Sequence, residues 1–236
     1  MERAFIFDVF GTLVDWRESV AQITQSAFKE RNLDTDPYEF ATYWRSRYGP
    51  AMYRIRTGER GYIPLDILHR ENLDETLAAF GIEEAFDAAA RAELNHAWES
   101  LSPWPDVIEG LDRLRHFGFL APCSNGSVAL SVRLARFAGF QWDAIVGAET
   151  ARDYKPKPEV YRASVGALGL SPDQVVMVAA HNGDLAAAAR EGLQTAFFPR
   201  PREHGPGQSE DLTAEGDWTY LARDLVDLVE QIEEES

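Results

Sequence analysis

Short continuous runs of apolar residues alternate along the chain with longer segments in which apolar positions recur every three or four residues. The continuous runs predict buried strands of a parallel sheet, because such strands have no face toward water. These runs cover residues 4–7, 119–123, 144–146, 175–180 and 195–198. Helical spacing is found at 107–114, 128–138 and 158–168, and a last apolar stripe covers 221–232. The alternation predicts an α/β fold with a doubly wound, Rossmann-like core.

The first predicted strand is followed by a long segment, residues 15–102, that has helical spacing and no convincing strand. We interpret this segment as an inserted helical cap domain. Pro103-Trp104-Pro105 marks the return to the core, because proline restricts its own backbone and that of the preceding residue. The predicted core domain therefore comprises residues 1–14 and 103–236. Ligands of open α/β sheets bind outside the carboxyl ends of the strands, so the cap is expected to cover the site.

The overall charge narrows the choice of partners. The 236 residues include 39 acidic side chains against 23 lysines and arginines, for a formal net charge of -16. Nucleic acids and anionic membranes attract basic surfaces, so neither is an expected partner. An anionic small molecule would need a local pocket of cationic side chains and backbone N–H groups, which salt screening makes possible.

The chain also carries few signs of export. Cys123 is the single cysteine and cannot form an internal disulfide, and the stretch MERAFIFD lacks the features of a secretory signal. No apolar stretch approaches the roughly 20 residues that a membrane-spanning helix needs. We therefore expect a cytoplasmic protein without a membrane segment.

Polar side chains follow four of the predicted strands where each strand ends. Asp8 and Thr12 follow the first strand, and placing an acid between Phe7 and Val9 is costly unless the acid is used. The later groups are Ser124-Asn125-Gly126, Lys155-Pro156 and Asp184. The carboxyl ends of parallel strands meet at one edge of the sheet, so we expect these groups to converge there.

The order and type of these residues resemble the haloacid dehalogenase superfamily across nearly the whole chain. Phosphatases of that superfamily carry a second acid two residues after the first, as the general acid, and further acids that help to bind magnesium. This chain has Phe10 and Ala180 at two of those positions. A hard cation needs several oxygen ligands, so the resemblance implies no metal and no other cofactor here.

Four stretches resemble the (S)-2-haloacid dehalogenase branch: DVFGTLVDWR, SNG, YKPKPEVY and VAAHNGDLAAAAREG. The resemblance implies that Asp8 displaces halide from a short 2-haloacid and forms an ester, which water then hydrolyses to the 2-hydroxy acid. It further implies that Lys155 orients Asp8, that Thr12 hydrogen-bonds near it, and that Asp184 activates or positions the water.

The same resemblance assigns the substrate contacts. Ser124 and Asn125 are expected to bind the substrate carboxylate, while Phe10 and Gly11 line the site. Tyr161 and His181 are also expected to line it, and His181 stands where an asparagine is familiar in the family. The halide is expected to meet a cap arginine from the segment WRSRYGPAMYRIR, with Arg47 as the first choice and Arg54 as the second.

Three alternatives remain open at this point. A haloacetate or fluoroacetate specialist would use the same chemistry with a tighter halide pocket, whose size the sequence does not determine. A magnesium-dependent phosphatase is disfavoured by Phe10 and Ala180, and a non-catalytic protein would bind small carboxylates without releasing halide. The expected partners are thus a haloacid and halide, and a homodimer is the expected assembly.

Overall fold

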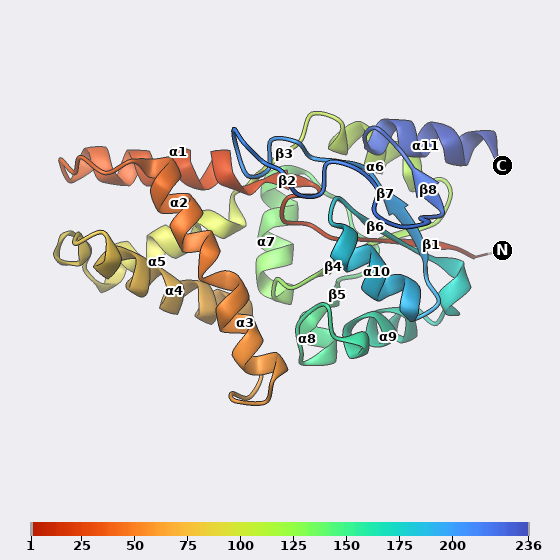
Figure 1. The fold of residues 1–236 in the computed structure, drawn as a ribbon, viewed down its shortest axis with the longest axis horizontal. Helices are drawn as coiled ribbons and strands as arrows, with labels where there is room; N and C mark the ends of the chain where they lie inside the picture. Colours follow the sequence, from red (N-terminus) through yellow and green to blue (C-terminus); the bar gives the residue numbers. More distant parts are fainter. Residues whose placement is uncertain (1, 236) are drawn as a thin grey trace.

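The computed structural model describes residues 2–235 and contains a six-stranded parallel sheet in the order β5-β4-β1-β6-β7-β8 (Figure 1). The strands are β1 (Ala4–Phe7), β4 (Phe119–Ser124), β5 (Val146–Gly147), β6 (Val175–Ala179), β7 (Gln194–Phe197) and β8 (Tyr220–Leu221). The predicted Rossmann-like α/β fold is confirmed. The edge strand β8 was not predicted, because the sequence places Leu221 in a helical stripe. In the structure Leu221 is exposed, and helix α11 begins at Leu225.

Helices cover both faces of the sheet. Along β1, Phe5 and Phe7 pack in a cluster with α6 (Val107–Leu114), α7 (Val128–Ala138) and α11 (Leu225–Glu234). Ala4 and Ile6 pack in the opposite cluster with α9 (Pro158–Ala167) and α10 (Asn182–Arg190). Successive side chains of a strand point to opposite faces, so a continuous apolar run serves both clusters. The remaining core helices are α8 (Ala148–Ala151) and the 3-10 helix η3 (Pro172–Gln174).

Helices α1 to α5 gather on one side of the molecule, and both ends of the described chain lie on the other (Figure 1). They are α1 (Trp16–Glu30), α2 (Pro37–Ser46), α3 (Tyr48–Arg56), α4 (Leu65–Ala79) and α5 (Ala88–Asn95), with the 3-10 helices η1 (Glu83–Ala85) and η2 (His96–Glu99). Two short strands, β2 (Val14–Asp15) and β3 (Ser102–Pro103), pair antiparallel where the chain leaves and re-enters the core. Sequence analysis found no strand at these positions. The predicted cap boundaries lie beside this pair and stay a prediction.

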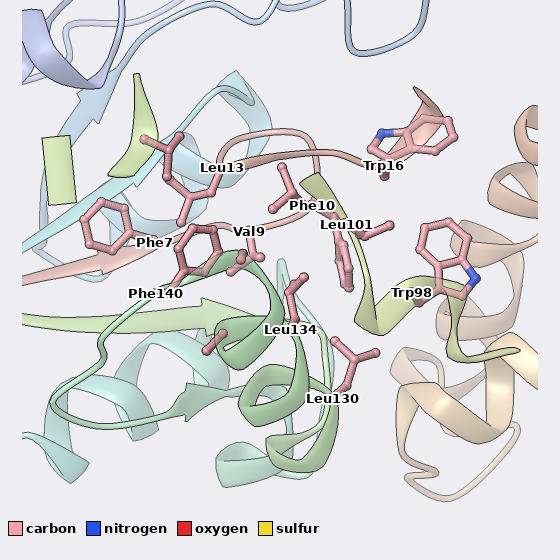
Figure 2. Packing of buried hydrophobic residues seen from close by; sticks show 14 of the residues in the cluster. Phe7, Val9, Phe10, Leu13, Trp16, Trp98, Leu101, Leu130, Leu134 and Phe140 are labelled. Atoms are coloured by element: carbon pink, nitrogen blue, oxygen red, sulfur yellow. The ribbon is translucent and has the colours of Figure 1, made fainter. Parts of the chain in front are cut away.

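Apolar packing is continuous from the sheet to the helices of residues 16–99 (Figure 2). The Phe10 ring meets the Trp98 ring edge-on at a centroid distance of 5.9 Å, and Trp98 stacks on Trp16 at 6.3 Å. Aromatic pairs of this kind add to the stabilisation that comes from burial itself. Phe10, two residues beyond Asp8, therefore joins the carboxyl edge of the sheet to the helical segment above it. Within residues 2–235, no helix is long and apolar enough to cross a membrane.

Candidate active site

Asp8 lies directly after β1, at the carboxyl edge of the sheet. Its backbone N–H donates to the carbonyl of Val178 at 3.0 Å, which continues the strand pairing, and its carboxylate is buried. The Thr12 hydroxyl donates to Asp8 Oδ2 at 2.7 Å. Thr12 Oγ1 in turn accepts from the N–H of Ala180 at 3.0 Å. The turn after β1 is thus tied to the end of β6, which sets the direction of the Asp8 carboxylate.

Lys155 joins two carboxylates. Its Nζ lies 2.8 Å from Asp8 Oδ1 and 2.5 Å from Asp184 Oδ2, and its side chain is buried. Its backbone N–H donates to Asn125 Oδ1 at 2.9 Å, so the loop after β4 positions it. Burial by itself raises the pKa of Asp8, but the charges of Lys155 and His181 outweigh burial and hold that pKa well below its usual range. Asp8 is therefore an ionised carboxylate at neutral pH.

Asp184 lies in the first turn of α10, but its side chain does not cap the helix. One oxygen accepts a hydrogen bond from Lys155 Nζ, and the other accepts a hydrogen bond from the Tyr161 hydroxyl. Burial and the nearby Asp8 charge raise the pKa of Asp184, against the lowering effect of Lys155. A carboxylate with a raised pKa, held between two donors beside Asp8, suits the role of a base toward water.

His181 and Glu203 extend this group on the other side of Asp8. His181 Nδ1 lies 3.0 Å from Asp8 Oδ2, and its Nε2 lies 2.8 Å from Glu203 Oε2. The Glu203 side chain is 2% exposed, and its other oxygen accepts from Trp16 Nε1 at 3.0 Å. Sequence analysis missed Glu203, because it lies in a segment rich in proline and glycine that reads as a surface loop. We call the following residues the Asp8 cluster: Asp8, Thr12, Lys155, Tyr161, His181, Asp184 and Glu203.

The turn after β4 places Ser124 and Asn125 beside the cluster, and both are buried. Ser124 Oγ accepts from the N–H of Gly126 at 3.0 Å, while Asn125 holds the backbone of Lys155. Asn125 also lies near Tyr48, which comes from the first turn of α3: burial raises the pKa of Tyr48, and the Arg45 charge and the Asn125 side chain are among the groups that lower it. A residue of the helical segment therefore reaches the carboxyl edge of the sheet.

Gly11 has a structural reason to be glycine. Its φ is +89°, and a Cβ built there would lie 2.1 Å from Glu203 Oε1. Its carbonyl accepts from Trp104 Nε1 at 2.9 Å. Glycine adopts this backbone conformation without strain and leaves room for the Glu203 carboxylate.

Of the predicted cap arginines, the structure brings neither Arg47 nor Arg54 to the Asp8 cluster. Arg47 is the residue directly after α2 and pairs with Glu75 at 3.1 Å, and the side chain of Arg54 is exposed. Arg45 lies closer to the cluster, because it is one of the charges that lower the pKa of Glu203. Arg47 is the single residue between α2, which ends at Ser46, and α3, which begins at Tyr48, and its side chain is partly exposed.

The Arg45 guanidinium lies on aromatic rings. Its central carbon is 3.9 Å from the ring centroid of Tyr48 and 5.5 Å from that of Trp16. Arg45 Nε is buried and has no hydrogen-bond partner within residues 2–235. The same holds for Trp98 Nε1 and for both ring nitrogens of His69. The His69 ring stacks on Trp98 at 4.4 Å and faces the Phe10 ring at 6.2 Å. Unpartnered buried N–H groups are rare in proteins, so this wall is suited to an anion.

The residues at the carboxyl edge do not fit a magnesium ion. Asp8 and Asp184 both bond to the Lys155 ammonium group, which stands between them. Phe10 and Ala180 supply no side-chain oxygen at the positions where phosphatases of the superfamily have acids. In the described part of the chain, no group of three or more histidine, cysteine or acidic side chains could hold a metal ion.

A parallel sheet with an aspartate after its first strand and a helical segment above it defines the class. The family model for haloacid dehalogenase-like hydrolases matches residues 2–192. The chain therefore belongs to this hydrolase family, and the resemblance inferred from its motifs is confirmed.

Known relatives narrow the likeness further. The (S)-2-haloacid dehalogenase of Xanthobacter autotrophicus is 30% identical over 203 residues, which are 85% of this chain and 76% of that enzyme. The solved structure of a defluorinating L-2-haloacid dehalogenase is 44% identical with a TM-score of 0.96, over 98% of this chain and 95% of that one. Another L-2-haloacid dehalogenase structure is 44% identical with a TM-score of 0.93, over 99% of this chain and 100% of that one.

Proposed function

We propose that this protein hydrolyses short (S)-2-haloacids to 2-hydroxy acids and halide through an ester of Asp8. One observation carries the proposal: an ionised, buried Asp8 is held by Lys155, Thr12 and His181, and Phe10 replaces the second acid of a phosphatase. The relatives named above support the same chemistry. A carboxylate beside an apolar wall suits attack on an alkyl halide, whose leaving group needs no proton.

In the first step, an Asp8 oxygen attacks the substrate carbon that bears the halogen. The new carbon–oxygen bond forms as the carbon–halogen bond breaks, and the halide leaves with the bonding electron pair. Lys155 keeps Asp8 oriented and ionised through its contact with Oδ1. Ser124 and Asn125 receive the substrate carboxylate, in the turn that also positions Lys155.

We assign the halide to Arg45 in place of Arg47 and Arg54. Arg45 is a cation on the aromatic wall, and its Nε is buried without a hydrogen-bond partner within residues 2–235. A fixed cation at the point where negative charge develops lowers the barrier to halide departure.

In the second step, water attacks the acyl carbon of the Asp8 ester. Asp184 takes a proton from that water, and Tyr161 and Lys155 hold Asp184 in place. The bond between the acyl carbon and the ester oxygen that carries the substrate carbon then breaks. That oxygen takes a proton from Lys155, which recovers one from Asp184, so the hydroxy acid is freed and the Asp8 carboxylate is restored. The oxygen added to the product therefore comes from Asp8, and the oxygen of the water enters Asp8.

Halide release from (S)-2-chloropropionate in the presence of a chelator tests the activity. We expect release to continue undiminished, because the edge of the sheet is not built for magnesium. Turnover of an aryl phosphate that depends on magnesium would support the phosphatase instead. Binding of haloacids with no halide release would support the non-catalytic alternative.

A single turnover in water labelled with heavy oxygen, with enzyme in excess, tests the covalent path. The label should enter the peptide that contains Asp8 and should be absent from the product. An unlabelled peptide beside a labelled product would show that water attacks the substrate directly. Asp8→Asn should be inactive in the same assay, because an amide is a poor nucleophile.

One observation favours a second candidate, a dehalogenase that also accepts fluoroacetate. Fluoride is a strong hydrogen-bond acceptor, and the wall beside Phe10 offers the buried, unpartnered N–H of Trp98 and the ring nitrogens of His69. Burial and the Arg45 charge keep the pKa of His69 well below its ordinary value, so the ring is neutral. Trp98→Phe should slow fluoride release from fluoroacetate more than chloride release from chloroacetate, and equal slowing would argue against this candidate.

We also propose a cytoplasmic homodimer without nucleic-acid or membrane partners. The buried Cys123 thiol, whose pKa burial raises to about 11, is compatible with a reducing compartment. Sedimentation of the purified protein tests the dimer, and fractionation of the native cell tests the location.

A further inference from the structure

His181 is held between two carboxylates. Asp8 Oδ2 faces its Nδ1 at 3.0 Å and Glu203 Oε2 faces its Nε2 at 2.8 Å. An ionised carboxylate can only accept hydrogen bonds, so both contacts are satisfied when both ring nitrogens carry a proton. The geometry therefore suits an imidazolium cation that donates to both partners.

The two oxygens of Asp8 have different partners. Oδ2 accepts from the Thr12 hydroxyl at 2.7 Å and faces His181, whereas Oδ1 contacts Lys155 at 2.8 Å. The Thr12 oxygen already accepts from the N–H of Ala180, which directs its own proton to Oδ2. Two donors occupy the lone pairs of Oδ2, so Oδ1 is the oxygen that is freer to attack.

From this asymmetry, and on the basis of the proposed function, we infer that Asp8 Oδ1 is the nucleophile and that Thr12 and His181 form an oxyanion hole at Oδ2 for hydrolysis of the ester. Oδ2 becomes the carbonyl oxygen of the ester and already lies against both donors. Glu203 is a positioning residue, which orients the ring and keeps it protonated.

The electron balance of the hydrolysis step follows from this assignment. Water gives a proton to Asp184 and its oxygen bonds to the acyl carbon, while the carbonyl electron pair moves to Oδ2. When the intermediate collapses, that pair re-forms the carbonyl and the bond from the acyl carbon to Oδ1 breaks. Lys155, which contacts both Oδ1 and Asp184, donates a proton to the departing oxygen and recovers one from Asp184.

Glu203 matters most after the ester has formed. Esterification removes the charge of Asp8, so the ring then keeps one carboxylate partner, which is buried and fixed by Trp16. Burial by itself lowers the pKa of His181, but Glu203 and Asp8 raise it well above its ordinary value. The other charged or titratable groups nearby are Lys155 and Asp184 beside Asp8, and Arg45 and His204 beside Glu203.

The test separates the two steps in single turnovers with enzyme in excess and (S)-2-chloropropionate as substrate. In His181→Ala we expect first-turnover halide release within about threefold of the wild type, and ester hydrolysis slowed by about 10²-fold or more, as for loss of an oxyanion-hole donor. The ester should accumulate and appear as added mass on the Asp8 peptide. Equal slowing of both steps, or no accumulated ester, would overturn the inference. His116→Asn, at an exposed histidine, is the matched control and should change neither step.

Glu203→Gln tests the positioning role through the pH profile of ester hydrolysis. Without the Glu203 charge the ring loses its proton more easily, so the alkaline fall in the hydrolysis rate should move to lower pH. An unmoved profile would refute the role of Glu203.

A measurement without substrate keeps the inference distinct from the proposed function. Nitrogen-15 NMR of the resting enzyme, assigned by loss of the signal in His181→Ala, should show both ring nitrogens protonated at pH 7. A neutral ring at pH 7 would refute the oxyanion hole whether or not the enzyme is active. If the wild-type enzyme releases no halide from any haloacid, the proposed function fails, while the NMR result still decides the state of the ring.

Discussion

Replacing Arg45 tests the proposed halide site and the choice of Arg45 over Arg47. Arg45→Ala removes a guanidinium that lies 3.9 Å from the Tyr48 ring centroid and whose Nε is buried without a partner within residues 2–235. Loss of a donor aimed at developing charge costs about 3–4 kcal/mol. At about 1.4 kcal/mol for each factor of ten, halide release should slow by about 10²- to 10³-fold.

The effect on stability should be much smaller. The cation–π contact of Arg45 is worth about 0.5–2 kcal/mol. Unfolding should therefore shift by only a few degrees, since about 1 kcal/mol changes Tm by about 2–4 °C in a chain of this size. Arg47→Ala is the matched control, because it removes a half-exposed pair with Glu75 that is worth about 0–1 kcal/mol.

Rapid-quench halide release from (S)-2-chloropropionate, together with thermal melting, measures both effects. Arg45→Lys should recover only part of the rate, because the ammonium group keeps the charge but cannot stack as the planar guanidinium does. Halide release by Arg45→Ala within about threefold of the wild type would refute the assignment. So would a loss of about tenfold or more in Arg47→Ala, which would restore the original prediction.

Further outcomes follow from the same contacts. A racemic 2-chloropropionate should lose only its S enantiomer and yield the inverted hydroxy acid, as chiral chromatography would show; a retained configuration would contradict backside attack. Lys155→Met should destabilise the fold by about 3–5 kcal/mol in denaturant unfolding, because it leaves Asp8 and Asp184 buried without their cation. This loss should lessen toward pH 4 as Asp184, whose pKa is already raised, takes a proton, and a pH-independent loss would contradict the charge argument. Gly11→Ala should lower Tm markedly, since the added Cβ meets the Glu203 carboxylate at a φ of +89°; an unchanged Tm would show that Glu203 moves freely. His181 has a folded-state pKa above its unfolded value of about 6.5, so its charge contributes stability that is fully present below that pH and is lost as pH rises through the folded pKa. The Tm deficit of His181→Ala should therefore shrink at alkaline pH, and a constant deficit would contradict this.

The sequence predicts the strand ends well because each apolar run is short and continuous, and the polar residue after it marks the carboxyl edge. The residues predicted at that edge, Asp8, Thr12, Lys155 and Asp184, lie together in the structure. Their catalytic roles stay a prediction until the variants are measured. The two-residue strands β2, β3 and β8 could not be predicted, since no continuous apolar run marks them and they form through pairing with distant segments.

Two features of the site could not be predicted from the sequence, each for a physical reason. The choice of Arg47 rests on the family resemblance alone, which does not show that α2 ends at Ser46 and α3 begins at Tyr48, with Arg47 between them. Glu203 was missed because its partners are remote in sequence: the Trp16 contact spans 187 positions. The proline- and glycine-rich composition of the segment around Glu203 indicates a loop, but it does not show which distant residues that loop packs against.

The charges at the site explain how a strongly acidic protein can accept an anionic substrate. Three carboxylates, Asp8, Asp184 and Glu203, stand against the cations Lys155 and Arg45 and against His181, which we infer to be protonated. The site then has no net charge, so it does not repel the substrate carboxylate. Salt screens the repulsion from the acidic side chains elsewhere on the protein. Alkylation removes the Asp8 charge as the halide appears, so Arg45 faces a new anion at the moment when Asp8 has become neutral. In Glu203→Gln two carboxylates face the three cations, so the site carries one excess positive charge while His181 is protonated and becomes neutral when His181 loses its proton. Haloacid binding by Glu203→Gln should therefore weaken as pH rises.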